Sequence, residues 1–214
     1  MNYSIIVLSC DKYDTCWQPF FALLDKYWKN HPKTYLVTET KQCEYSKTIN
    51  INSDCWTERF KKALEQIDTD YVIIMLDDFF IRNKVDTKRI DYCLSQMNDD
   101  IAVFNFEKKY RQCDESNLIG FERQLNNQVY LNSCQPSLWN RKALIERLQD
   151  NETPWQWETK RVGDKRLCYI NTQDFIIDIG YNHTLDWGIS RGKLTPECKE
   201  FLKKEGFELD KEVF

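Results

Sequence analysis

Two adjacent carboxylates, Asp77 and Asp78, directly follow the uncharged run 71–76 and precede two phenylalanines. Neighbouring carboxylates repel each other and are costly to desolvate, so they persist together mainly where a cation, a proton or water relieves them. Carboxylate oxygens suit Mg2+ or Mn2+, which usually bind one or two protein carboxylates together with phosphate oxygens of a substrate. We therefore expect a divalent-cation and phosphate site here. The alternative is a polar strand end without a ligand.

A second group of polar residues follows the first apolar segment, in the stretch 9–14. Ser9 and Asp11 suit hydrogen bonds to a ribose or a base edge, as acids do in other nucleotide-binding α/β folds. Asp11 or Asp14 would serve equally well as a turn or cap residue for the next helix. The sequence has neither a Gly-x-Gly-x-x-Gly fingerprint nor a P-loop, so a bound phosphate must be held in another way.

The elements that position these residues follow from the hydrophobic pattern. The uncharged run before the acids is typical of a strand buried on both faces of a parallel sheet. Apolar strands alternate with helical patterns, which indicates βαβ units. In such sheets ligands bind at the carboxyl ends of the strands, where both groups of polar residues would lie. The expected strands are 3–9, 34–38, 71–75 and 101–106, and the expected helices are 17–28, 56–67 and 86–97.

The C-terminal half has a less regular pattern. Pro136 is suited to the first turn of a helix over 136–148, and an aromatic helix is expected over 151–158. The remaining expected elements are strands at 129–131, 168–170 and 175–179 and a final helix at 195–205. No internal repeat or linker divides the chain, so we expect one domain, with residues 1–107 forming a ligand-binding half and 108–214 a second half.

Composition narrows the class of protein. The 214 residues carry a net charge of −4, which argues against nucleic-acid binding because a phosphate-backbone footprint needs a basic face. No apolar run reaches bilayer length, and the N-terminus lacks the features of a signal peptide. Nine cysteines without a Cys-x-x-Cys pair favour a reducing cytoplasm. The basic clusters 108–111 and 160–166 are interpreted as solvated faces, or as contacts to an anionic lipid surface at the inner face of the membrane or to a phosphorylated substrate.

Several segments together resemble a bacterial GT-A-fold glycosyltransferase of the polysaccharide-assembly kind. They are 7–13, 17–28, 35–39, 56–59 and 76–80, and the likeness spans Tyr3 to about Glu158. The resemblance implies a Rossmann-like α/β domain with a central, mostly parallel sheet flanked by helices. It also implies a nucleotide-sugar donor, a divalent cation and an Asp-x-Asp motif at the end of a central strand. This chain departs from that motif, because it reads Leu76-Asp77-Asp78-Phe79.

The resemblance also implies roles for individual residues. It places Ser9, Asp11 and Glu39 near the nucleoside, and Asp78, with Asp77 beside it, on the metal and the diphosphate. Arg59 would reach the donor phosphates, or else pair on the surface with Glu58 or Asp54. A late histidine, His183, would be a further metal ligand, although a lone histidine is more often structural. Arg191 and Lys193 would close over the diphosphate as a basic lid around Gly192.

The acceptor side is expected in the C-terminal half. Sugar transfer with inversion needs a general base, usually a carboxylate. Glu158 is the first candidate because Trp155 and Trp157 precede it, and the alternative is a helix with core tryptophans and a solvated glutamate. Asp174 is the second candidate. Gln135 would hydrogen-bond a sugar hydroxyl or merely cap a helix.

The expected activity is transfer of a monosaccharide from a nucleoside-diphosphate sugar to a hydroxyl group of a glycan or lipid-linked saccharide, as in assembly of capsule, exopolysaccharide or lipopolysaccharide. Two alternatives stay open. One is a nucleotidyltransferase, which shares the strand-end acids and the metal. The other is a carbohydrate-binding protein without catalysis.

Overall fold

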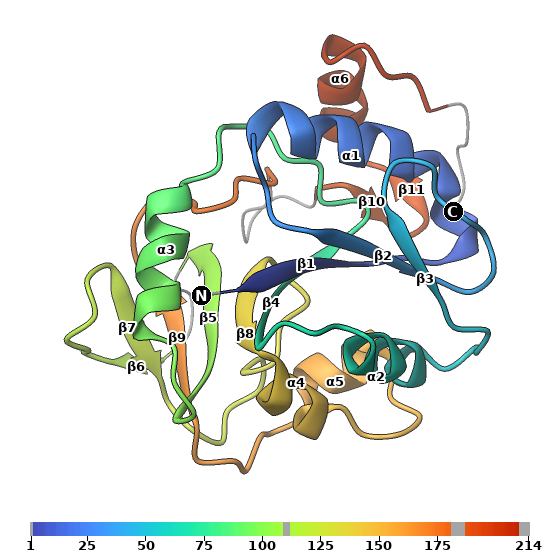
Figure 1. Ribbon diagram of the computed structural model, residues 1–214. Helices are drawn as coiled ribbons and strands as arrows, with labels where there is room; N and C mark the ends of the chain where they lie inside the picture. The colour runs from blue at the N-terminus through green and yellow to red at the C-terminus, as the bar shows by residue number, and fades with distance from the viewer. Residues whose placement is uncertain (1, 109–111, 181–186, 210–214) are drawn as a thin grey trace.

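A nine-stranded sheet with helices on both faces organises the computed structural model, which describes residues 2–108, 112–180 and 187–209 (Figure 1). The strand order is β3-β2-β1-β4-β8-β5-β9-β7-β6, and a two-stranded hairpin lies apart from the sheet. The sheet strands are β1 (Tyr3–Leu8), β2 (Thr34–Thr38), β3 (Lys47–Asn50), β4 (Tyr71–Leu76), β5 (Ile101–Lys108), β6 (Cys113–Asp114), β7 (Phe121–Gln124), β8 (Ser137–Asn140) and β9 (Leu167–Asn171). The hairpin consists of β10 (Ile189–Ser190) and β11 (Lys193–Leu194).

Helices cover both faces of this sheet. The helices are α1 (Asp14–Tyr27), α2 (Trp56–Glu65), α3 (Thr87–Gln96), α4 (Arg141–Arg147), α5 (Pro154–Thr159) and α6 (Pro196–Lys204). In Figure 1, α1 and α6 lie on one side of the first strands, and α2, α4 and α5 lie on the other. Within the described residues only β7 and β8 run opposite to the remaining sheet strands. The expected α/β fold with a central, mostly parallel sheet is therefore confirmed.

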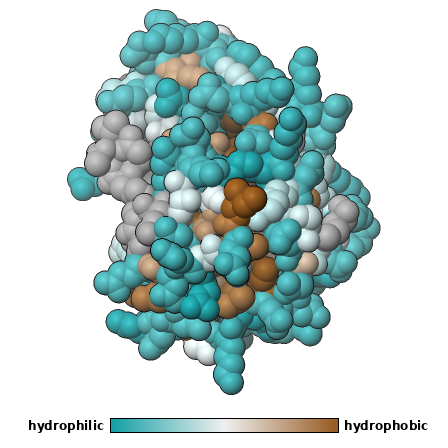
Figure 2. Space-filling model, turned by 90° about the vertical axis from the view of Figure 1, so that its left-hand side faces the viewer, coloured by the Kyte–Doolittle hydropathy of each residue, from teal (hydrophilic) through white to brown (hydrophobic). Residues whose placement is uncertain are grey.

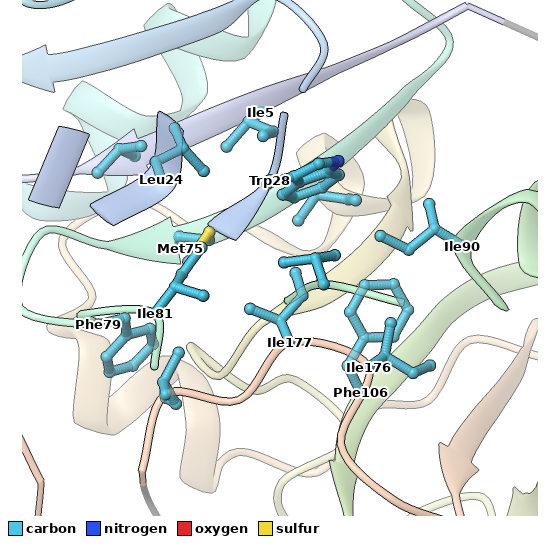
Figure 3. Close-up of a cluster of buried hydrophobic side chains, with 14 of the residues drawn as sticks. Ile5, Leu24, Trp28, Met75, Phe79, Ile81, Ile90, Phe106, Ile176 and Ile177 are labelled. Carbon is cyan, nitrogen blue, oxygen red and sulfur yellow. The ribbon is translucent and has the colours of Figure 1, made fainter. Parts of the chain in front are cut away.

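The central strands are apolar because both of their faces are covered. β1 and β4 pair in parallel from Tyr3 with Tyr71 to Leu8 with Leu76. Alternate residues of each strand enter one of two hydrophobic clusters. Ile5 and Met75 belong to the cluster under α1 and α3, which Figure 3 shows. Ile6 and Ile74 belong to the cluster under α2 and α4, so the prediction of strands buried on two faces is confirmed.

Helix boundaries follow the capping residues. The Asp86 side chain accepts a hydrogen bond from the Arg89 backbone N–H at 3.2 Å, which starts α3 where its sequence predicts. Thr153 and Gln156 form a capping box at the start of α5, where Pro154 occupies the first turn. Such caps satisfy backbone groups that have no partner within the helix.

The helix expected over 136–148 is wrong in its first part. Residues Ser137–Asn140 form β8, which lies antiparallel between β4 and β5. The consecutive residues Leu138 and Trp139 pack into the clusters on opposite faces of the sheet. α4 begins only after Asn140, whose side chain accepts the Ala143 N–H at 3.2 Å. An asparagine cap, not the proline, marks this helix start.

Two expected strands are also wrong. Residues 129–131 form turns, and Tyr130 has a φ of 60°. Residues 175–179 have no strand structure, although Ile176, Ile177 and Ile179 are buried. These isoleucines belong to an irregular segment that packs against the core. The backbone N–H of Arg82, in the loop after β4, donates to the Asp178 carbonyl oxygen of this segment at 2.8 Å. The strand expected at 168–170 is confirmed as β9, and the final helix as α6.

The surface of the described residues is mainly polar on the face that carries β6, β7 and α3, where hydrophobic residues occur in small groups (Figure 2). In the described ranges, no helix has the length and apolar character needed to cross a bilayer.

Candidate functional site

The parallel strands β1, β2 and β4 bring three predicted loops to one edge of the sheet. Backbone hydrogen bonds between neighbouring strands continue past the ends of β1 and β4. Ser9 N donates to Val37 O at 3.0 Å, and Asp77 N donates to Leu8 O at 3.3 Å. The loops that carry Ser9, Glu39 and Asp77 therefore lie side by side, as the parallel arrangement predicts.

Asp77 faces inward, with 5% of its surface exposed. One carboxylate oxygen accepts the hydroxyl of Ser9, and that hydroxyl oxygen accepts the indole N–H of Trp17 at 2.8 Å. Burial, together with the neighbouring Asp78 charge, raises the pKa of Asp77 well above its usual value, although the Ser9 hydrogen bond opposes this shift. Asp77 thus joins the ends of β1 and β4 internally.

Asp78 instead lines a cavity of about 280 Å3. Its Oδ2 accepts the backbone N–H of Ile189 at 3.0 Å. Burial raises the pKa of Asp78 to about 6, and the hydrogen bond from Ile189 opposes the shift. The adjacent acids therefore occupy different environments, one inside the fold and one on a cavity wall.

A glycine lets the chain cover Asp78 this closely. Gly188 has a φ of +74°, and an added Cβ would lie 2.6 Å from the Asp78 carbonyl oxygen and 2.9 Å from Oδ2. A larger residue would therefore be strained in its backbone and too close to Asp78. The segment 187–190 sits directly on the strand-end acid as a result.

The antiparallel strand β8 brings the C-terminal half to the same cavity. Ser137 pairs with Ile74 near the end of β4, so the residues just before β8 lie beside Asp78. Cys134 and Gln135 line the cavity together with Glu158 from α5. Glu158 Oε1 accepts the Cys134 backbone N–H at 2.6 Å. The complete lining is Leu76, Asp78, Phe79, Cys134, Gln135, Pro154, Glu158, Ile179, Trp187, Ile189 and Ser190.

The two tryptophans before Glu158 have different environments. Trp157 is fully buried, 5.6 Å from Trp56 and 5.8 Å from Trp139 between ring centroids. Trp155 is 65% exposed. Trp155 thus fits the expectation of an accessible aromatic side chain near Glu158, and Trp157 fits the alternative of a tryptophan in the core.

The loops after β1 and β2 are joined by the side chain of Asp11. It accepts hydrogen bonds from the Thr38 hydroxyl, from Thr40 and from the Lys41 backbone N–H at 3.1 Å. Desolvation raises the pKa of Asp11, but the hydrogen bonds outweigh it and hold the pKa well below its usual value. Asp11 therefore lies beside the end of β2, and its carboxylate oxygens bond to the protein itself.

Glu39 and Arg59 form an ion pair at the same end of the sheet. Glu39 Oε1 lies 3.0 Å from an Arg59 guanidinium nitrogen, and Oε2 accepts the Asp11 backbone N–H at 2.6 Å. Arg59 is 9% exposed and also donates to Ser53 O at 2.6 Å. The pairing expected with Glu58 or Asp54 is replaced by this buried pair, because Arg59 lies on the inner side of α2.

Other predicted residues lie elsewhere. The Asp174 side chain is fully exposed beyond β9, 3.6 Å from Lys108 Nζ, and does not line the cavity. Arg191 and Lys193 are exposed at the turn between β10 and β11, where Arg191 has a φ of 52°. His183 lies outside the described residues.

Sequence reasoning assigned no role to several neighbours of Asp78. Burial raises the pKa of Tyr13 to about 12, and the charges of Asp78 and Asp77 add to the shift, which places this phenol close to both acids. Tyr13 stands in the loop after β1, where its position offered a signal. Gly188 and Ile189 are more than a hundred residues beyond Asp78, and no local pattern predicts that contact.

A larger hollow, about 630 Å3, lies between the start of α1 and the loop after β2. Trp17, Lys41 and Tyr45 line it, but no predicted site residue does. Within the described ranges, no three His, Cys, Asp or Glu side chains form a group that would hold a metal. Asp78 and Glu158 are the carboxylates among the described residues that line the cavity, and carboxylate oxygens are ligands that suit Mg2+ or Mn2+.

No protein-family model and no curated protein matches this sequence. Similar solved structures include the bifunctional IspDF from Campylobacter jejuni, at 17% identity and a TM-score of 0.45, covering 72% of this chain and 45% of that one. A cytidylyltransferase from Leptospira borgpetersenii has 10% identity and a TM-score of 0.47, covering 74% and 68%. The galactosyltransferase LgtC, solved with donor and acceptor sugar analogs, has 14% identity and a TM-score of 0.44, covering 67% and 59%.

The chain spans about half of the IspDF structure and about two thirds of the cytidylyltransferase. All three TM-scores lie below 0.5.

Proposed function

We propose that this chain is a glycosyltransferase that moves a monosaccharide from a nucleoside-diphosphate sugar to a hydroxyl group of a glycan or lipid-linked saccharide. One observation carries the proposal. Asp78, from the end of β4, and Glu158, from α5, line the same cavity at the carboxyl edge of the sheet. Sugar transfer with inversion needs two such groups, one for the departing diphosphate and one for the incoming hydroxyl.

Asp78 is the proposed metal and diphosphate residue. A bound Mn2+ or Mg2+ would supply charge stabilisation to the leaving diphosphate. The Ile189 N–H fixes one oxygen of Asp78, and the carboxylate is ionised above a pH of about 6. His183 stays a proposed further ligand, and Arg191 and Lys193 stay proposed contacts of the diphosphate.

Glu158 is the proposed general base toward the acceptor hydroxyl. The Cys134 N–H holds one carboxylate oxygen at 2.6 Å, which limits rotation of the group that must accept the proton. Gln135 lies on the same wall and offers an amide to a sugar hydroxyl. Asp174 ranks second, because its carboxylate is in solvent and outside the cavity.

The nucleoside is proposed to lie beside the loops after β1 and β2. Ser9, Asp11, Glu39, Arg59 and Asp77 bond mainly to one another and to the backbone there. They would hold the loop conformation and contact a nucleoside through their remaining hydrogen-bonding capacity.

Thermal-shift measurements with nucleotide sugars, with and without Mn2+, test the proposal. A ligand that binds only the native state raises the melting temperature as its concentration exceeds the dissociation constant. We expect a Mn2+-dependent shift with at least one nucleotide sugar, which Asp78→Asn removes. Asp68→Asn is the matched control, because Asp68 is exposed before the start of β4 at the opposite edge of the sheet.

The product separates the competing functions. Release of a nucleoside diphosphate from the sugar nucleotide supports the transferase. Release of pyrophosphate from a nucleoside triphosphate would instead indicate a nucleotidyltransferase. Saccharide binding that is unchanged by Asp78→Asn, without either product, would indicate a binding protein.

A further inference from the structure

Trp155 is 65% exposed although the helix that carries it is firmly anchored. The capping box of Thr153 and Gln156 fixes the start of α5. Trp157 anchors its other side between Trp56 and Trp139 in the core. The Thr159 hydroxyl donates to the Trp155 carbonyl oxygen at 2.7 Å. A large aromatic ring is therefore held in solvent by a rigid support, which is typical of a binding surface.

Tyr130 stands next to this indole. The two ring centroids are 6.1 Å apart, with an angle of 74° between the ring planes. Tyr130 has a φ of 60°, which an aromatic residue adopts only at a cost of about 1 kcal/mol or more. Its backbone N–H donates to the Glu158 carbonyl oxygen at 2.7 Å. This bond ties the strained turn to the helix that carries the proposed base.

Helix geometry places the aromatic pair at the rim of the cavity. Pro154 and Glu158 line the cavity and are four residues apart, so they share one face of α5. Trp155 is three residues before Glu158 and occupies the neighbouring face, away from buried Trp157. The exposed ring and the carboxylate are therefore adjacent, and Gln135 lies on the same cavity wall.

This combination fits a sugar ring. One face of a pyranose carries C–H groups that pack on an aromatic ring, while its hydroxyl groups bond to carboxylates and amides. A purely apolar partner would leave the carboxylate of Glu158 and the amide of Gln135 without hydrogen bonds from the ligand.

We propose that Trp155 and Tyr130 form a stacking subsite for a neutral saccharide unit of the acceptor, positioned so that its hydroxyl faces Glu158. The subsite rests on the proposed transferase function and adds the class of acceptor: an oligosaccharide or glycan with an exposed ring, rather than a small alcohol.

The test compares wild type with three variants of the whole chain. Cellotetraose, chitotetraose, mannotetraose and galactotetraose are titrated into wild type, Trp155→Ala, Trp155→Phe and Ile119→Ala, with binding followed by saturation-transfer NMR. Ile119 is the control for loss of exposed apolar surface, since it is 75% exposed and outside the cavity lining. Melting temperatures verify that each variant is folded. Hydrolysis of nucleotide sugars by water is measured on the same samples.

We expect wild type to bind at least one tetrasaccharide and Trp155→Ala to bind it about tenfold more weakly. Trp155→Phe should retain most of the affinity and Ile119→Ala all of it, with donor hydrolysis unchanged in each variant. Equal binding by wild type and Trp155→Ala, or no binding of the four sugars by wild type, would overturn the subsite. Trp155-dependent binding to phosphatidylglycerol vesicles in place of sugars would also overturn it. Saccharide binding that needs Trp155, in a protein with neither nucleotide-dependent stabilisation nor donor hydrolysis, supports the subsite and rejects the transferase.

Discussion

The two ends of the carboxyl edge of the sheet use acidic residues differently. Beside β1 and β2, Asp11 and Glu39 bond to backbone N–H groups, hydroxyls and a buried arginine. Beside β4 and α5, Asp78 and Glu158 face a shared cavity. Carboxylates that bond to the backbone and side chains of the protein stabilise a backbone conformation, whereas carboxylates on a cavity wall can contact a ligand. Residues of the same chemical type thus form an internally bonded framework, Asp11 and Glu39, and a candidate site, Asp78 and Glu158.

The largest effect expected from this comparison is on transfer. Glu158→Gln keeps the shape of the side chain and removes its basicity, so acceptor-dependent transfer should fall by about 100-fold to 10,000-fold. Donor binding and donor hydrolysis by water should persist, because the diphosphate side is unchanged. Steady-state kinetics with and without acceptor measure both rates.

Asp174→Asn is the matched variant for this prediction. Its carboxylate is in solvent beside Lys108, and an exposed pair of this kind contributes little to stability. If Asp174→Asn, rather than Glu158→Gln, abolished transfer with donor hydrolysis intact, the assignment of the base to the cavity would be wrong.

A smaller effect is expected where the chain covers Asp78. Gly188→Ala places a methyl group within 3 Å of the Asp78 backbone, at a φ that favours glycine. We expect a loss of about 3 kcal/mol in the free energy of unfolding, measured with urea. Gly163→Ala is the control, because its added Cβ meets no atom within 4 Å. Equal stability of the two variants would show that segment 187–190 is not seated on Asp78 in solution.

The strands and loops of the framework were more predictable from the sequence than the candidate site with Asp78 and Glu158. β1, β2 and β4 are continuous apolar runs, and each could be assigned from its own residues because both faces are covered. Their parallel arrangement then predicted that the loops after them would meet. The Asp86 cap of α3 was likewise a local signal.

The cavity is formed by contacts between residues that are far apart in the sequence, which no local sequence pattern predicts. β8 is a strand because it pairs with β4 and β5, while its sequence, Pro136 included, also suits the start of a helix. That strand brings Gln135 beside Asp78. Gly188 packs against Asp78, although the two residues are far apart in the sequence. Glu158 was found through its tryptophans, but which of them faces solvent depends on packing against Trp56 and Trp139.

A third prediction concerns the framework acid. Asp11→Asn removes the negative charge that accepts several hydrogen bonds from 38–41, and should lower the free energy of unfolding by about 2 kcal/mol at pH 7. The folded-state pKa of Asp11 is depressed, so its stabilisation is present above the unfolded pKa of about 3.9 and is lost as the pH falls through the folded value. The difference from wild type should therefore shrink on acidification.

The smallest effect expected is of opposite sign and concerns Asp78. Burial raises its folded-state pKa to about 6, so the folded protein binds more protons than the unfolded chain between about pH 4 and pH 6. The associated stability is complete below the unfolded pKa and is lost as the pH rises through about 6. In metal-free buffer Asp78→Asn should thus be more stable than wild type at pH 7, by about 1 kcal/mol after allowance for partial solvent access.

Urea unfolding of wild type, Asp11→Asn and Asp78→Asn, at about one-unit steps from about pH 2 to about pH 7, measures both trends together. The Asp78→Asn advantage should shrink toward zero at about pH 4 and below, where Asp78 is protonated in the folded protein and increasingly protonated in the unfolded chain. Such a gain in stability on removing a charge is expected where the carboxylate serves to bind a ligand, because that carboxylate then destabilises the ligand-free protein. If Asp78→Asn were instead less stable than wild type at pH 7, Asp78 would belong with Asp11 to the framework, and the division of the edge into two roles would fail.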